Sequence, residues 1–303
     1  MDRDSKKLVQ KLIVDAICLG TVGFSVLFFY LWGSPYHRGF FCSDLSIRYP
    51  FKESTVPSKY LYLIGLGLPT SAILLLEYLY RSSEQARHSL LGTNIPNWIY
   101  SAYNNILWFL FGAACSQLTT DVGKYTIGRL RPHFIDICQP SVECKDEKNE
   151  LKYIEYAECT GPLTHKYTDS RLSFPSGHSS LSFYCMVYLA LYLQARIKTA
   201  KYGMARSFFQ FLVLLMAAFC ALSRVSDYKH HWSDVLVGTL LGSIIAVITA
   251  LFVSDLFTSK FKSSRKRNNS SDNVDTANDF QTTELKGIFT KKKAAIEERR
   301  TLF

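Results

Sequence analysis

The feature that most limits the fold of this chain is a series of six long, predominantly apolar blocks. They run from Val9 to Trp32, Tyr60 to Tyr80, Trp98 to Thr120, His178 to Leu193, Ser207 to Leu222 and Val235 to Phe257. In lipid, a lone segment must satisfy its own backbone hydrogen bonds, and these blocks are too long and too uniformly apolar for barrel strands. We therefore expect an all-α, polytopic membrane protein with a six-transmembrane-helix bundle, the fourth and fifth helices being the shortest.

Positive charge is unevenly distributed between the blocks. The net charge is +10, and Lys and Arg crowd two places, the connection between the fourth and fifth blocks and the segment just after the sixth. These residues are Arg196, Lys198, Lys201 and Arg206, then Lys260, Lys262, Arg265, Lys266 and Arg267. The positive-inside rule places both groups in the cytoplasm. Six crossings then put both termini inside and the segments after blocks one, three and five outside.

The eight cysteines divide between the blocks and the expected outer segments. Cys18, Cys115, Cys185 and Cys220 lie in blocks, and Cys42, Cys138, Cys144 and Cys159 lie in outer segments. Four cysteines in an oxidising compartment can form two disulfides, although their spacing leaves the pairing undetermined. A zinc site is the weaker alternative, because the spacing fits no common zinc finger.

Two segments differ in composition from the blocks. Residues 131–173 contain prolines, cysteines and mixed charges, and we expect an outer loop with little regular structure that caps a site. We expect the membrane domain to comprise residues 1–258 and a basic, largely disordered cytoplasmic tail to follow at 259–303, in which residues 264–278 are disordered. Residues 291–300 fit either a basic helix on the inner leaflet or a solvated charged run.

The first of three polar clusters follows the third block. Lys124 and Arg131 are seven residues apart, which is two turns if the helix continues, so both cations would project from one face. Pro132 discourages further helix. Cations of this kind bind phosphate oxygens, but a cationic belt at a helix end is an equally good reading of this cluster alone.

The second cluster opens the fourth block with Pro175, Ser176, Gly177 and His178. A proline followed by small residues starts a helix whose free backbone N–H groups and positive end suit an anion. His178 would lie in the first turn, where it can give a proton to a departing alkoxide. The alternative is a polar helix cap with an interfacial histidine.

The third cluster joins the fifth and sixth blocks. Arg224 offers a permanent fork of donors for phosphate oxygens. His230 and Asp234 are four residues apart and would face each other across a helical turn, so that the carboxylate orients the imidazole. His231, three residues from Asp234, competes for this role. Because all three clusters fall on the outer face when crossings are counted, we expect them to form one site.

Together the clusters resemble a known three-part signature. Lys-x6-Arg-Pro, Pro-Ser-Gly-His and Ser-Arg-x5-His-x3-Asp are similar to the motifs of the type 2 phosphatidic acid phosphatase superfamily. The surrounding residues, GRLRPHF, RLSFPSGHSS and LSRVSDYKHHWSDVL, resemble the animal lipid phosphate phosphatases, also called phospholipid phosphatases. The similarity runs from about the first block to the end of the sixth and excludes the tail.

The resemblance implies a role for each candidate residue. His230 would be the nucleophile that forms a phosphohistidine, Asp234 would orient it, and His178 would be the acid for the leaving group. The residues that would bind phosphate are Lys124, Arg131, Arg224, Ser176 and Gly177. Members of this family work without a metal ion, so we expect no metal and no other cofactor.

The resemblance also implies the substrates and the location. The expected substrates are lipid phosphate monoesters such as phosphatidic acid, lysophosphatidic acid, sphingosine 1-phosphate and ceramide 1-phosphate. We expect an integral protein of the plasma membrane, with an internal membrane as the alternative, an extracellular or lumenal site, possible homo-oligomers and no nucleic-acid partner. A related phosphotransferase and a lipid-binding or transport protein without catalysis are the competing functions.

Overall fold

The computed structural model describes residues 3–81, 88–90, 93–142, 144, 151–197, 199–254 and 256–257. All of the helices and strands described lie in the unit Met1–Ser254. The domain boundary predicted after residue 258, the disorder predicted for residues 264–278 and the basic helix considered at 291–300 concern residues outside this described part, and they stay predictions.

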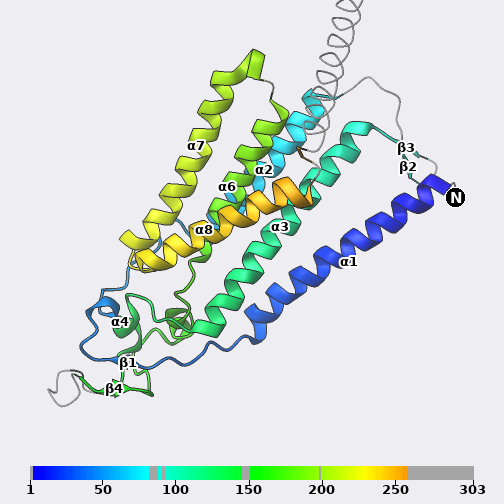
Figure 1. Ribbon diagram of the computed structural model, residues 1–303. Coiled ribbons are helices and arrows are strands. Elements are labelled where there is room, and N and C mark those ends of the chain that lie inside the picture. The colour runs from blue at the N-terminus through cyan, green and yellow to red at the C-terminus, as the bar shows by residue number, and fades with distance from the viewer. Residues whose placement is uncertain are drawn as a thin grey trace, which may run out of the picture. The chain divides into compact units, whose positions relative to one another are not determined.

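Within the described residues, six long helices occupy the positions of the six apolar blocks (Figure 1). They are α1 (Arg3–Trp32), α2 (Ser58–Leu79), α3 (Asn97–Ile127), α6 (Gly177–Arg196), α7 (Thr199–Ser226) and α8 (Trp232–Ile248), and a short π-helix, η4 (Thr249–Val253), continues α8. The prediction of an all-α membrane protein is confirmed. Four of the helices, α1, α2, α7 and α8 with its extension, are long and apolar enough to cross a membrane. The count of six spans is not confirmed.

Helix α6 is surrounded by protein, and this allows it to be more polar than a helix that faces lipid. It packs against α2, α3, α7 and α8. Tyr184, Tyr188 and Tyr192 on α6 have no exposed surface, and the Tyr184 hydroxyl donates to the carbonyl oxygen of Phe109 on α3 at 2.7 Å. Polar side chains that face the interior of a helix bundle are satisfied by neighbouring helices. The short fourth apolar block, from His178 to Leu193, therefore corresponds to α6, which four other helices surround.

Two glycines bring α8 against the start of α6. A Cβ on Gly238 would lie 2.6 Å from the carbonyl oxygen of Ser176, and one on Gly242 would lie 2.0 Å from that of Ser180. Small residues four positions apart allow helix backbones to approach closely. The Ser176 N–H also donates to the backbone oxygen of Asp234 at 3.0 Å. The first turns of the two helices are thus held together.

Helix α3 ends at Gly128, which has a left-handed φ of 57°. A Cβ there would lie 2.0 Å from the carbonyl oxygen of Tyr36, so both the backbone angle and the space require glycine. The prediction that Lys124 and Arg131 share one helix face is therefore wrong, because the helix stops before Arg131.

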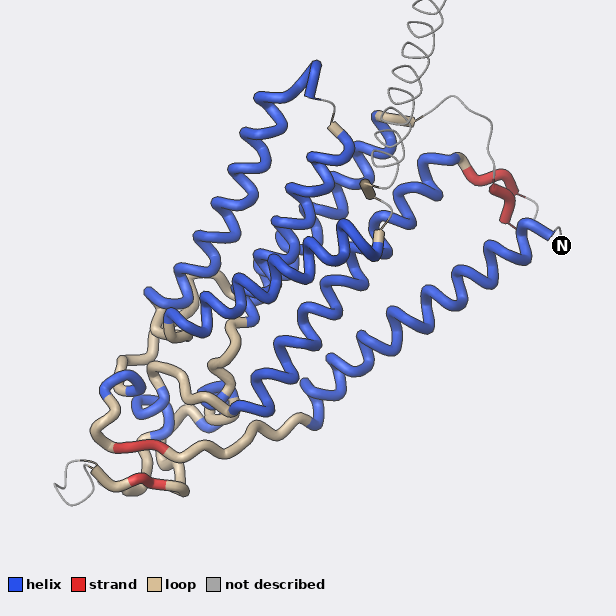
Figure 2. Tube along the Cα trace, in the orientation of Figure 1, coloured by secondary structure: helices blue, strands red, loops and turns tan. Residues whose placement is uncertain are grey.

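The described residues of 33–57 and 128–176, which we call the cap, cover the end of the bundle where α1 and α3 finish (Figures 1 and 2). The cap contains short elements: β1 (Phe40–Phe41), η1 (Leu45–Ile47), α4 (Phe134–Cys138), β4 (Tyr153–Ile154), η2 (Thr164–Lys166) and η3 (Asp169–Arg171). Strands β1 and β4 pair antiparallel. A small hairpin, β2 (His88–Leu90) with β3 (Thr93–Ile95), lies at the opposite end of the bundle.

Two disulfides stabilise the cap. Cys42 pairs with Cys144, and Cys138 pairs with Cys159. The first of these joins the two segments of the cap across 102 residues of sequence. Phe40 and Phe134 pack edge to face in a small apolar core beside the disulfides. The cap therefore has a core of its own, although its elements are short.

Candidate active site

The three polar clusters line one pocket of about 300 Å³ where the helices meet the cap. The predicted residues in its wall are Lys124, Arg131, Gly177, His178, Arg224 and His230. The structure therefore brings together residues that are spread over about a hundred positions of sequence. Asp234 and Ser176 lie behind this wall, in contact with its residues.

His230 is almost completely buried, and its ring is held by a backbone carbonyl. Its Nδ1 lies 2.7 Å from the carbonyl oxygen of Ser173, which can only accept, so Nδ1 carries the hydrogen. The other nitrogen, Nε2, then has the free lone pair. Burial lowers the pKa of His230 to about 4, helped by the positive charges of Arg131 and Lys124 against the effect of Asp234. The imidazole is therefore neutral at pH 7.

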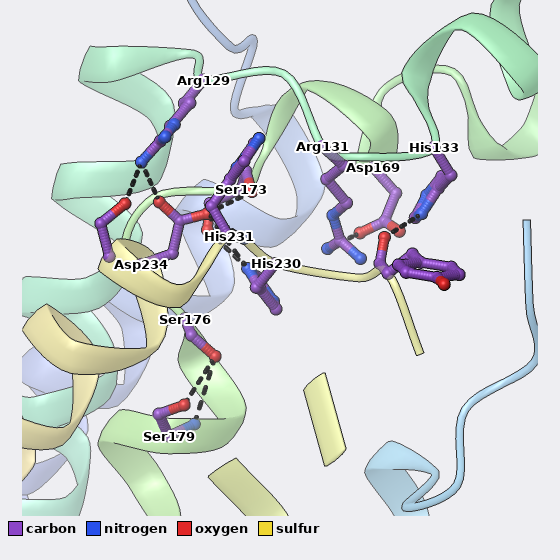
Figure 3. Close-up of polar contacts among 12 residues, drawn as sticks. Arg129, Arg131, His133, Asp169, Ser173, Ser176, Ser179, His230, His231 and Asp234 are labelled. Carbon is purple, nitrogen blue, oxygen red and sulfur yellow. Dashed lines mark hydrogen bonds and ion pairs between the residues drawn. The ribbon is translucent and has the colours of Figure 1, made fainter. Parts of the chain in front are cut away.

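Asp234 supports this arrangement from behind (Figure 3). It accepts a hydrogen bond from the Ser173 hydroxyl at 2.6 Å and pairs with Arg129 Nη1 at 2.5 Å. Its distance to His230 Nδ1 is 3.9 Å, beyond a hydrogen bond. The expected helical turn between His230 and Asp234 is wrong, because α8 begins only at Trp232. Asp234 instead binds the hydroxyl of Ser173, and the carbonyl oxygen of Ser173 binds Nδ1 of His230.

The structure separates His230 from its neighbour His231. His231 is the residue just before α8, where its backbone N–H and its Nδ1 lie 3.0 and 3.2 Å from Asp234 Oδ2. It lines a different cavity, of about 440 Å³, on the side of Arg129 and β1. Only His230 of the two reaches the pocket of the three clusters.

His178 lies in the first turn of α6, as predicted, and is also bound by a backbone carbonyl. Its Nε2 is 3.1 Å from the carbonyl oxygen of Val56, just before α2. Because that oxygen only accepts, Nε2 carries a hydrogen, and Nδ1 is the nitrogen left for proton exchange. The two histidines thus present opposite ring nitrogens to their carbonyl partners.

Ser176 and Gly177 form the start of α6. The Ser176 hydroxyl accepts from the Ser179 hydroxyl at 2.9 Å and caps the helix. Its contact with phosphate stays a prediction. A Cβ on Gly177 would lie 3.1 Å from Lys124 Nζ, so glycine leaves room for the ammonium group beside the helix N-terminus. The N-terminus of α6 and the ammonium group of Lys124 both concentrate positive potential at this wall of the pocket.

The two arginines of the pocket are each fixed by a carboxylate. Arg131 pairs with Asp169 at 2.6 Å, and Arg224 pairs with Asp227 at 2.7 Å. The Nε of Arg131 is buried without a hydrogen-bond partner among the described residues. A buried donor in that state costs free energy unless a ligand accepts from it. This is consistent with a pocket built for an anion.

Several contributors to the site were not predicted. Lys229 lines the pocket with its ammonium 3.7 Å from the centre of the Phe51 ring. Burial lowers the pKa of Lys229 to about 8, as does the charge of Arg131. The segment before α2 contributes Phe51, Glu53 and Ser54 to the pocket wall. Thr55 in the same segment donates to Asp227 through both its N–H and its hydroxyl, at 2.8 and 2.7 Å.

Only part of this support could have been found in the sequence. Asp227 is three residues from Arg224, a spacing that favours an ion pair on a helix. Ser173 and Val56 hold the two histidines through carbonyl oxygens, which every residue has, so the sequence gives no signal of these two contacts. In the part of the chain that the structure describes, no group of three or more His, Cys, Asp or Glu residues is arranged to hold a metal ion.

Comparisons with known proteins identify the family of the chain. Residues 105–257, which include every candidate residue, match the PAP2 superfamily. A Drosophila melanogaster protein provisionally named a phosphatidate phosphatase is 45% identical over 268 residues, which cover 84% of this chain and 71% of that protein. Phospholipid phosphatase 1 of Rattus norvegicus is 40% identical over 258 residues, 83% of this chain and 88% of that protein.

Phospholipid phosphatase 2 of Homo sapiens is 38% identical over 251 residues, which cover 81% of this chain and 83% of that protein. No solved structure matches. The matched segment and the extent of these similarities, together with the pocket that the three motifs line, show that the chain belongs to the PAP2 superfamily.

Proposed function

We propose that the protein hydrolyses phosphate monoesters of lipids through a phosphohistidine intermediate. The chain is a phosphatase by its family, with relatives named phosphatidate phosphatase and phospholipid phosphatase. The observation that carries the mechanism is the pair of histidines in one cationic pocket, each with one nitrogen bound to a backbone carbonyl. The second nitrogen of each ring is then available for chemistry.

In the first step, the Nε2 lone pair of His230 attacks phosphorus. A bond forms between nitrogen and phosphorus, and the bond from phosphorus to the lipid oxygen breaks. The departing alkoxide takes a proton from Nδ1 of His178, whose doubly protonated form is favoured by the bound phosphate dianion. The lipid alcohol leaves, and the phosphoryl group stays on His230.

In the second step, water attacks phosphorus and gives a proton to Nδ1 of His178. The nitrogen–phosphorus bond breaks, its electron pair returns to Nε2 of His230, and inorganic phosphate leaves. Lys124, Arg131 and Arg224 bind the phosphate oxygens in both steps, with Gly177 and Ser176 forming the helix start beside them. Asp234 orients His230 through Ser173. No step requires a metal ion or another cofactor.

The membrane placement belongs to the same proposal. We take α3 and α6 as additional spans, which makes six, and the two disulfides in the cap support a cap outside the cytoplasm. The pocket then lies at the headgroup level of the non-cytoplasmic leaflet, in the plasma membrane. This position suits phosphatidic acid, lysophosphatidic acid, sphingosine 1-phosphate and ceramide 1-phosphate. Assembly into homo-oligomers stays an untested prediction.

The experiment is phosphate release by the purified full chain in detergent, with phosphatidic acid and an excess of chelator. We expect equal amounts of free phosphate and diacylglycerol, and radioactive phosphate trapped on protein in a bond that is stable in alkali and lost in acid. Binding without turnover would contradict the proposal. Transfer of the phosphoryl group to an added alcohol, which gives a new phosphate monoester in place of free phosphate, would identify a phosphotransferase instead.

Sidedness has a separate test. The four lipid phosphates are supplied to intact cells that express the chain, and their hydrolysis is compared with that by permeabilised cells. We expect hydrolysis by intact cells at a rate close to that after permeabilisation. Hydrolysis only after permeabilisation would place the pocket on the cytoplasmic side.

A further inference from the structure

A third cavity, of about 620 Å³, lies between α2, α6 and α7, and nearly all of its lining is apolar. Its floor consists of buried residues, which are Leu61, Gly65, Ser182, Met186, Ala217 and Cys220. Its rim consists of exposed apolar side chains, among them Ile64 on α2 and Leu215 on α7, which are 43% and 52% exposed. We call this cavity the α2–α7 groove.

The groove is open between two helices that would face lipid. Helices α2 and α7 both pack on α6 and are both apolar enough to cross a membrane. Figure 1 shows α6 between them. The exposed rim is therefore in contact with the hydrocarbon of a bilayer, and a lipid chain can enter sideways without leaving an apolar environment.

The groove adjoins the pocket of the three clusters. Leu61 lines both cavities. Val56 lines the groove, and its carbonyl oxygen is the hydrogen-bond partner of His178 at 3.1 Å. The groove thus begins beside the histidine that protonates the leaving lipid oxygen, which is the atom from which the lipid body extends.

We propose that the α2–α7 groove binds an acyl chain of the lipid phosphate while its phosphate occupies the pocket. This inference rests on the proposed function. Lipid tails are as apolar as the groove, so its contribution is orientation of the phosphate and not transfer out of water. The groove therefore determines which lipids turn over fast, because a chain that fills it aligns the leaving oxygen with His178.

Gly65 offers a way to fill the groove from inside. A Cβ at this position would contact only Cys185 Sγ, at an ordinary 3.6 Å, so a larger side chain can extend into the groove. Gly67 provides a matched control on the same helix. A Cβ on Gly67 has nothing within 4 Å, and Gly67 does not line the groove.

The experiment compares Gly65→Trp and Gly67→Trp as full chains in detergent micelles, with dioleoyl and dihexanoyl phosphatidic acid as substrates. The readout is the ratio of kcat/KM for the long-chain lipid to that for the short-chain lipid. We expect Gly65→Trp to lower this ratio at least tenfold and Gly67→Trp to leave it within twofold of the unsubstituted protein. An unchanged ratio in folded Gly65→Trp would overturn the proposal.

Photolabelling of the unsubstituted protein gives a readout that needs no substitution. A phosphatidic acid with a diazirine halfway along one acyl chain should label peptides of α2, α6 or α7, and excess phosphatidic acid should suppress this labelling more than phosphatidylcholine does. Labels confined to α1 or α3, or equal suppression by both lipids, would contradict the binding of an acyl chain in the groove. Failure of the unsubstituted protein to release phosphate from either lipid would instead contradict the proposed function.

Discussion

Two buried ionic clusters lie at opposite ends of α2, α3 and α6, and their charge balance differs. The cluster far from the cap centres on Glu77, which is 7% exposed. It accepts hydrogen bonds from the Tyr192 hydroxyl at 2.7 Å and from Asn105 at 3.1 Å, and it pairs with Arg196. One carboxylate and one guanidinium balance each other there.

The pocket under the cap is not balanced. Among the described residues of its lining, the cations are Lys124, Arg131, Lys166, Arg224 and Lys229, and the carboxylates are Glu53 and Asp169. Asp227, which pairs with Arg224 outside this lining, raises the carboxylates to three against five cations. Mutual repulsion of buried cations costs free energy that a balanced cluster avoids. The difference between the two clusters is that the first is neutralised by its own residues, while the second has an excess of positive charge that a bound anion would offset.

The largest expected effect comes from His230→Ala. If this variant kept its activity, the pocket would be a structural cluster like that of Glu77, and the difference between the two clusters would not hold. Removal of a nucleophile lowers kcat by at least about a thousandfold. The measurements are phosphate release from phosphatidic acid and trapping of the labelled protein, which should disappear together. His231→Ala is the matched control, and we expect it to keep most of the activity because His231 lines a different cavity. Equal losses in both variants would contradict the assignment of the nucleophile.

Lys124→Ala is expected to reduce activity next most. Loss of one cation that binds phosphate oxygens should lower kcat/KM by about 100-fold. Because this cation has cationic neighbours, we expect the midpoint of thermal unfolding in detergent to stay the same or to rise. A large fall in that midpoint with little loss of kcat/KM would place Lys124 in a structural cluster like that of Glu77.

Glu77→Ala should show the opposite pattern. Removal of Glu77 leaves the buried Tyr192 hydroxyl and the partly exposed Arg196 guanidinium without their acceptor, which costs about 1–3 kcal/mol of the free energy of unfolding. We expect a midpoint of thermal unfolding several degrees lower, with kcat per folded molecule nearly unchanged. A specific loss of kcat with unchanged stability would mean that the two clusters are coupled.

The apolar blocks and the three motifs could be predicted from sequence because they depend on side chains. Spans need long apolar stretches, and phosphate binding needs cations and histidines. The convergence of Lys124, His178 and His230 on one pocket followed from counting helix crossings. Disulfide partners could not be predicted, since any pairing of the four outer cysteines was compatible with the sequence.

The local geometry of the site was not predictable because backbone groups and helix ends decide it. Gly128 stops α3 before Arg131, and His230 precedes α8, so the expected helical spacings do not apply. The partners of the two histidines are the carbonyl oxygens of Ser173 and Val56. A carbonyl is positioned by the fold of the chain, and the identity of the residue does not reveal it.

The smallest expected effect concerns Lys229 and sharpens the estimate of how much positive charge the pocket needs. Burial lowers its pKa to about 8, and Arg131 and Lys166 act in the same direction against Asp169 and Glu53. The side chain is therefore charged below pH 8 and loses its charge as the pH rises above 8. We expect KM for phosphatidic acid to rise severalfold between about pH 7.5 and 9, where the phosphate is already a dianion.

Two substitutions separate the charge of Lys229 from its packing. Lys229→Arg stays charged throughout this range, so its KM should not rise with pH. Lys229→Gln has no charge to lose, so its KM should be high and constant from pH 7.5 to 9. If the pH dependence of KM persists in both variants, another group is responsible, and the anion is held by the four remaining cations. If both variants are flat and only Lys229→Gln has a raised KM, the charge imbalance of the pocket contributes directly to substrate binding.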